Sequence, residues 1–369
     1  MVYNPEILKK HYDILPHGTA KESAIREAIY EADKNSDVPF MVFFREELCS
    51  EANFYGNAMY MMTVFPELLS IIDKYPDTPT TQFDRVYDNA LDHILWIYKW
   101  VIIKCSSFYQ IPLEDCKKFF ADFKKRYINY GYSLKPYYRA VYYFYSFNKE
   151  EEDKAFNKFM AAKRDSNSDC QACERNTEIE FYLNNGNFNK ALQLSEDIEN
   201  FRLRCLNGYY DSWIRVKMSF LNYYIDNGNF EEASKTAHLL EPYIDNRTEF
   251  LQWGTIINCY AHTNPGRALR IYKKYWKELE KGGTPLDEFD ILKNTCCFFW
   301  VIKKQGKESI KFNADISFPL YTKDKTYSTD SLYNYYCLRA EDIALKFDKR
   351  SNTDKCIKTL EKALKIADI

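Results

Sequence analysis

Apolar residues recur every three or four positions along most of the chain, and no long segment alternates strictly between apolar and polar residues. The segment from about Leu113 to Tyr130 is a clear example, with its aromatic residues on one helical face and its lysines largely on the other. This period is typical of amphipathic α-helices. The pattern therefore predicts an all-α protein whose helices each bury one face.

Two segments of the chain match each other closely, residues 181–191 and 223–233. Each contains the end of a helix, a glycine, a polar residue, an aromatic residue and, three positions later, an alanine. The two glycines, Gly186 and Gly228, are 42 residues apart. Glycine readily adopts the positive φ with which many helices end, and a small alanine lets two helix backbones approach closely. The repeated segment therefore predicts two helix hairpins.

This turn, between two amphipathic helices, resembles the turn of a tetratricopeptide repeat. Tyr182 and Tyr224 occupy the position where the family prefers an aromatic residue before the turn. Weaker copies are expected at Ala268, 35 residues after Ala233, and at Ala155, 36 residues before Ala191. The 42-residue offset exceeds the usual repeat of about 34. We therefore expect residues 200–208 to lengthen a helix or to add a loop.

The chain as a whole is similar to a broad group of bacterial tetratricopeptide-like helical repeat proteins, in particular at residues 169–173 and 347–350. The resemblance implies an α-solenoid of helix hairpins and no activity, and it carries over no catalytic residue. We expect a degenerate, less regular helical N-terminal region at 1–135, tetratricopeptide-like repeats at 136–285, and a C-terminal helical capping region at 286–369.

A peptide-binding groove follows from the same resemblance, because the first helix of each hairpin lines a concave surface in tetratricopeptide arrays. Side-chain amides there can bond both the N–H and the C=O groups of an extended peptide, and aromatic rings can anchor its side chains. The alternative is that several of these residues pack between repeats or are simply solvated. The register of the repeat motif predicts that the following residues face this groove: Asn176, Glu180, Leu183, Arg215, Met218, Asn222, Phe250, Trp253, Ile257 and Tyr260.

The 11 cysteines are mostly scattered singly, as is usual for a chain in a reducing compartment. Cys170 and Cys173 form a CxxC pair that could bind zinc with Cys205 as a third ligand and His238 or Cys259 as a fourth. The chain has no second CxxC pair. We therefore predict half-buried thiols without metal or cofactor and keep the zinc site as the alternative.

Charge and composition narrow the function classes. A net charge of −2 gives no general attraction to nucleic acid or to an anionic membrane, although Lys117–Tyr145 mixes lysines with aromatic rings. We expect no secretory signal, and the apolar stretch Ile94–Ile103 is too short to span a bilayer. These features predict a cytoplasmic protein without membrane or nucleic-acid partners.

No catalytic motif stands out, because the five histidines are far apart and no phosphate-binding glycine loop or nucleophile elbow is present. The sequence therefore predicts a non-catalytic scaffold that binds a protein or peptide. The main alternative is a peptide-sensing signalling regulator that acts on a partner through its N-terminal helices. A nucleic-acid-binding or hydrolytic effector is less favoured.

Overall fold

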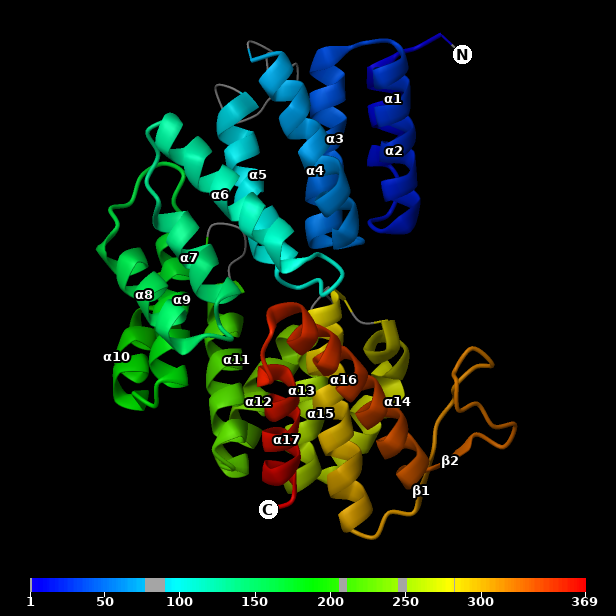
Figure 1. The fold of residues 1–369 in the computed structure, drawn as a ribbon. Helices are drawn as coiled ribbons and strands as arrows, with labels where there is room; N and C mark the ends of the chain where they lie inside the picture. The colour runs from blue at the N-terminus through cyan, green and yellow to red at the C-terminus, as the bar shows by residue number, and fades with distance from the viewer. Residues whose placement is uncertain (1, 77–89, 206–210, 245–250, 282) are drawn as a thin grey trace. The chain divides into compact units, whose positions relative to one another are not determined.

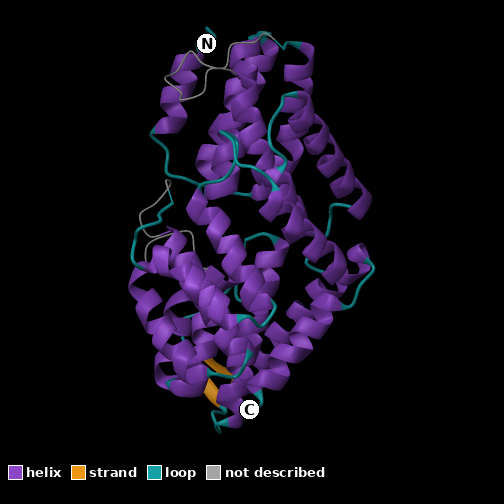
Figure 2. Ribbon diagram, turned by 90° about the vertical axis from the view of Figure 1, so that its left-hand side faces the viewer, coloured by secondary structure: helices purple, strands orange, loops and turns teal. Residues whose placement is uncertain are grey.

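The computed structural model describes residues 2–76, 90–205, 211–244, 251–281 and 283–369. Across these residues the protein is 75% helical, with 17 helices and a single pair of three-residue strands (Figure 2). The prediction of an all-α protein is confirmed. The contacts divide the chain into two compact units, residues 1–168 and 169–369, each of which is described by itself.

The first unit is an all-helical bundle in which helices adjacent in sequence pack against each other (Figure 1). Two clusters of buried apolar side chains form its core, one around α2 and α3 and the other around α4 to α7. The described helices are α1 (Pro5–Asp13), α2 (Thr19–Lys34), α3 (Val38–Phe54), α4 (Ala58–Lys74), α5 (Ala90–Cys105), α6 (Leu113–Asn129), α7 (Lys135–Phe144) and α8 (Lys149–Ala161).

The turn between α3 and α4 shows how sequence fixes this bundle locally. The Asn57 side chain accepts a hydrogen bond from the N–H of Met59 at 3.0 Å, and the N–H of Asn57 donates to Glu22 of α2 at 2.7 Å. A Cβ at Gly56 would lie 2.0 Å from the same Glu22 carboxylate, so a larger residue there would displace this side chain. A buried carboxylate thereby joins α2 to the α3–α4 hairpin.

The second unit contains the two matching hairpins and the rest of the helices. They are α9 (Gln171–Asn184), α10 (Phe188–Glu199), α11 (Asp211–Asp226), α12 (Phe230–Ile244), α13 (Leu251–Thr263), α14 (Pro265–Lys281), α15 (Pro285–Lys304), α16 (Thr329–Ser351) and α17 (Lys355–Ala367). The strands β1 (Ser309–Lys311) and β2 (Thr326–Ser328) pair antiparallel between α15 and α16.

The two predicted hairpin turns have nearly identical geometry. Gly186 ends the first with a φ of 71°, and the N–H of the next residue, Asn187, donates to the C=O of Tyr182 at 2.8 Å. Gly228 has a φ of 69° and is followed by the same 2.8 Å bond. Both bonds satisfy a carbonyl at a helix C-terminus, where intrahelical donors run out.

The alanines after these turns are the points of close helix approach. Ala191 and Ala233 are both fully buried, as is Ala268 after the third turn. The first helices of successive hairpins then pack in series, α9 on α11, α11 on α13 and α13 on α15. The extra residues after α10 form a loop in the described part, because α10 ends at Glu199.

The weaker fourth copy, the α7–α8 hairpin around Ala155, lies within the first compact unit. The contacts therefore group it with the N-terminal helices, whereas the sequence grouped it with the repeats at 136–285. Repeat pattern and contact density are different criteria, and the three sequence-defined regions stay a prediction.

Candidate functional site

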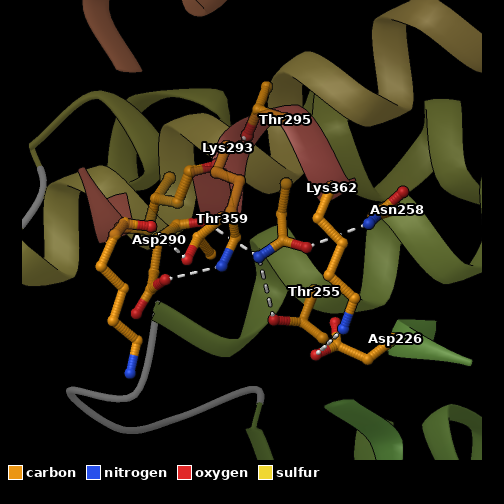
Figure 3. A network of polar contacts seen from close by, with 11 residues as sticks. Asp226, Thr255, Asn258, Asp290, Lys293, Thr295, Thr359 and Lys362 are labelled. Atoms are coloured by element: carbon orange, nitrogen blue, oxygen red, sulfur yellow. Dashed lines mark hydrogen bonds and ion pairs between the residues drawn. The ribbon is translucent and has the colours of Figure 1, made fainter. Parts of the chain in front are cut away.

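A cavity of about 350 Å³ lies within the second unit. It is lined by α11, α13 and α15, which are first helices of successive hairpins, together with the start of α12 and one side of the last helix, α17. Polar side chains from these helices meet around it (Figure 3). Its volume falls in the range of small-ligand pockets, about 300–1,000 Å³.

Three asparagines in the cavity wall come from three different helices. Asn222 on α11, Asn258 on α13 and Asn294 on α15 are separated by 36 residues each time. The Asn258 amide donates to the Asn294 carbonyl oxygen at 3.0 Å, and the Asn294 amide donates to the main-chain carbonyl of Asp290 at 2.9 Å. Asn222 is exposed at the rim, whereas Asn258 and Asn294 are only 4% and 8% exposed.

The side-chain carbonyl of Asn258 is buried and finds no hydrogen-bond partner among the described residues. A buried acceptor without a donor costs about 1–3 kcal/mol, so native proteins rarely tolerate one without a reason. Asn258 itself lines the cavity, although this oxygen is buried behind the cavity wall. Amide side chains can both donate and accept hydrogen bonds, as recognition of a peptide backbone requires.

His262 lines the same cavity one helical turn after Asn258. Its ring stacks on Phe230 with the centroids 3.5 Å apart, and its Nε2 atom has no hydrogen-bond partner within the described parts of the chain. Burial lowers the pKa of His262 to about 4. The ring is therefore neutral at pH 7, and its Nε2 atom is buried.

Four of the five charged residues that line the cavity are paired, and the fifth, Asp287, accepts hydrogen bonds from Thr284. Lys293 donates to Asp290 at 2.8 Å, and Lys362 of α17 lies 3.4 Å from Asp226 of α11. Burial lowers the pKa of Lys293, but the Asp290 carboxylate outweighs burial and the net pKa is raised, so the ammonium stays charged. The site thus offers amides and paired charges, and this suits a polar ligand of low net charge better than a strongly charged one.

The structure separates the residues predicted to line the groove into two groups. Met218 and Asn222 do line the cavity, whereas Arg215 is exposed outside it. Asn176 is buried and donates to Glu180 at 2.7 Å, neither lining the cavity. Leu183 belongs to the core packed between α9 and α11, and Phe250 lies outside the described residues.

On α13 the predicted residues pack inside the protein. Trp253 is 2% exposed and stacks on Tyr275 with centroids 4.5 Å apart, and Ile257 is fully buried. Tyr260 is also buried, and its hydroxyl donates to Glu241 at 3.1 Å. None of the three lines the cavity, and their burial agrees with the alternative that such residues pack between helices.

The residues that do face the cavity from α13 were missed: Gln252, Thr255, Asn258 and His262. At about 100° per residue, the predicted positions 253, 257 and 260 and the observed positions 252, 255, 258 and 262 lie on nearly opposite faces of α13. The signal that would have found them is the recurrence of asparagine at 222, 258 and 294, a regular 36-residue spacing. The prediction instead aligned the repeats on the alanine of each turn.

The three cysteines of the alternative metal site come together in the structure. The Sγ atoms of Cys170, Cys173 and Cys205 all lie within 4.8 Å of one another. His238 and Cys259, the proposed fourth ligands, do not belong to this group. The cluster does not line the cavity.

The aromatic residues considered from the sequence for nucleic-acid binding are poorly placed for it. The aromatic side chains Phe120, Phe123, Tyr127, Tyr142 and Phe144 are buried in the core of the first unit, so they offer no stacking platform for bases. Among the helices that the structure describes, none is long and apolar enough to cross a membrane.

No protein-family model matches the chain, and a search of the curated proteins returns no match. The class of protein therefore follows from the fold and the site alone. This is an all-helical protein in whose second unit neighbouring helices pack together around a cavity lined by α11, α13, α15 and α17.

Proposed function

We propose that the chain is a non-catalytic scaffold of tetratricopeptide-like hairpins that binds a short, extended peptide segment of a partner protein in the cavity of the second unit. The observation that supports this most directly is the set of three asparagines, Asn222, Asn258 and Asn294, in the wall of the cavity. A peptide backbone presents N–H and C=O groups in alternation, and amide side chains can pair with both.

The arrangement of helices supports a solenoid of this kind. The two turns of matching geometry and the series of contacts from α9 through α11 and α13 to α15 are what stacked hairpins produce. The cavity size limits the bound segment to a few residues, because α17 closes one side of it. A peptide terminus or a short loop fits this space better than a long strand.

The test is a selection from a library of short random peptides displayed on phage, using the full chain as bait. Selected peptides are then synthesised with a fluorophore and titrated by fluorescence anisotropy. Each lost amide contact is worth about 1 kcal/mol, so Asn222→Ala and Asn258→Ala should each weaken binding about fivefold or more. Asn313→Ala, an exposed asparagine outside the cavity, is the matched control and should bind as wild type does.

Two results would argue against the proposal. One is a selection that yields no peptide binding above that of an unrelated bait. The other is a set of peptides whose affinity is the same for wild type, Asn222→Ala and Asn258→Ala, because such peptides bind elsewhere.

A peptide-sensing regulator is the second candidate function, and the separate compact unit formed by residues 1–168 supports it. In a regulator, peptide binding in the second unit changes the first, whereas in a simple scaffold it does not. Hydrogen–deuterium exchange of the full chain with and without a selected peptide distinguishes them. Protection confined to α11, α13, α15 and α17 favours the scaffold, and changes within α1 to α8 favour the regulator.

A further inference from the structure

Three cysteine side chains converge at the beginning of the second unit. Cys170 is the N-cap residue of α9, and Cys173 lies in the first turn of that helix. Cys205 comes from the loop that follows α10 and is 32 residues further along the chain than Cys173. The Sγ atoms of Cys173 and Cys205 are 3.7 Å apart, and all three sulfur atoms lie within 4.8 Å of one another.

The loop that supplies Cys205 is the insertion that lengthens this repeat to 42 residues. It is held by defined contacts: the N–H groups of Arg202 and Leu203 both donate to the carbonyl of Asp197, at 2.8 and 2.9 Å. Phe201 adopts a left-handed φ of 54°. The insertion thus follows a specific path, and the described part of that path ends with Cys205 beside α9.

We propose that Cys170, Cys173 and Cys205 form a Zn²⁺ site with three thiolate ligands and a fourth position open to water or to another small ligand. Zinc binds thiolate at about 2.3 Å in tetrahedral geometry, which places neighbouring sulfur atoms roughly 3.8 Å apart. The Cys173–Cys205 separation of 3.7 Å already matches this edge. The remaining separations need to shorten by no more than about 1 Å, within the reach of a side-chain rotation at a helix end and a loop.

The surroundings are suited to three thiolates. The N–H of Cys173 donates to the sulfur of Cys170 at 3.4 Å, as an N-cap bond to a ligand sulfur does. Arg215 of α11 acts electrostatically on Cys173 in the direction that favours a thiolate. The guanidinium of Arg215 would offset part of the negative charge of the loaded site.

Binding releases protons, since one Zn²⁺ and three thiols give a zinc tris-thiolate of charge −1 and three protons. No oxidant or reductant takes part. The metal would tie the insertion to the first turn of α9 and so fix the start of the hairpin series. Three protein ligands make the zinc more exchangeable than a closed four-ligand site would.

The experiment uses the full chain, reduced and freed of metal, and titrated with Zn²⁺ against a chromophoric chelator. We expect one zinc per chain, release of about three protons at neutral pH in weak buffer, and a melting temperature that rises with free zinc. Cys170→Ser, Cys173→Ser and Cys205→Ser should each weaken binding tenfold or more. Cys356→Ser, a half-buried cysteine outside the cluster, is the control and should bind zinc as wild type does.

Co²⁺ loading of the wild-type chain gives a readout that does not depend on the variants folding. A sulfur-to-cobalt charge-transfer band in the near ultraviolet supports the site, and its absence at saturating Co²⁺ overturns it. Zinc binding that is unchanged in the three variants, or lost equally in Cys356→Ser, also overturns it. So does a reduced chain that binds no zinc but readily forms a Cys173–Cys205 disulfide on exposure to air.

Discussion

Replacing the asparagine pair of the cavity by leucine, in the double variant Asn258→Leu/Asn294→Leu, should make the protein more stable. Residues placed for binding frequently cost stability, because they hold polar groups where apolar ones would pack better. The two side chains are 4% and 8% exposed, and the carbonyl of Asn258 finds no partner among the described residues. The free energy of unfolding therefore contains a penalty that leucine removes.

The size of the expected gain in unfolding free energy follows from the contacts that are lost and gained. The double variant loses one amide hydrogen bond of about 0.5–1.5 kcal/mol and the interaction of Asn294 with the Asp290 carbonyl. It relieves an unpaired acceptor worth about 1–3 kcal/mol and buries two leucine side chains, each worth up to about 1.5–3 kcal/mol. The adjoining cavity gives the larger side chains room. We expect a net gain of about 1–3 kcal/mol.

The single variants sharpen the test. Asn258→Leu alone leaves the Asn294 carbonyl without the donor that it has at 3.0 Å, so its gain should be smaller than half that of the double variant. The two changes should therefore be non-additive by about 1 kcal/mol, as expected for residues in contact. Equilibrium urea unfolding at pH 7, followed by circular dichroism, measures all four proteins.

Thr295→Val serves as the comparison, since Thr295 is fully buried next to Asn294 but does not line the cavity. Its hydroxyl donates to the Ile291 carbonyl at 2.8 Å, and we expect a change within about 1 kcal/mol of wild type. A double leucine variant that is less stable than wild type by more than about 1 kcal/mol would refute the reasoning. The asparagines would then be structural, and the argument for a binding cavity would lose its main support.

Ala191→Leu and Ala233→Leu should each destabilise the protein by about 1–3 kcal/mol in urea unfolding, because both alanines are fully buried. Leu192→Ala, at a half-exposed position, should change the free energy of unfolding far less. Equal unfolding midpoints for all three variants would contradict the hairpin packing. The pKa of His262, lowered to about 4 by burial, makes the neutral ring the folded form; its contribution to stability is complete above about pH 6.5 and is lost as the pH falls from 6.5 towards 4. The melting temperature should depend less on pH between 4 and 6.5 in His262→Phe than in wild type, and it should keep the wild-type dependence in His238→Gln, whose side chain is exposed. An unchanged pH dependence in His262→Phe would show that another group causes the loss of stability at low pH.

Much of the helical architecture could be predicted from the sequence because it depends on local signals. The turns at Gly186 and Gly228 require a residue that tolerates positive φ, so the glycines in the sequence predict where these turns lie. The amphipathic period of α6 marks its buried face before any packing partner is known. Such features are encoded within ten or twenty residues, so a single sequence suffices to find them.

The candidate site depends on register between helices, and a turn motif fixes that register only to within a residue or two. Cys205 illustrates a further limit, because its approach to Cys173 depends on the path of an insertion whose composition says little about its geometry. The closing of the cavity by α17 is a third case. The last hairpin was predicted as a cap, but nothing in its own residues indicates that Lys362 reaches Asp226 of α11.

Trp253 and Asn222 give a direct test of which register is correct, because the sequence placed both on one inner surface. In the structure Trp253 is 2% exposed and stacks on Tyr275, so Trp253→Ala should cost about 3–5 kcal/mol of unfolding free energy. Asn222 is exposed at the cavity rim, so Asn222→Ala should change stability by less than about 0.5 kcal/mol while weakening a selected peptide. Urea unfolding and peptide titration of the same two preparations separate packing from binding. A Trp253→Ala variant with wild-type stability and reduced peptide affinity would restore the tryptophan to the binding surface and rotate α13 by about half a turn from the arrangement described.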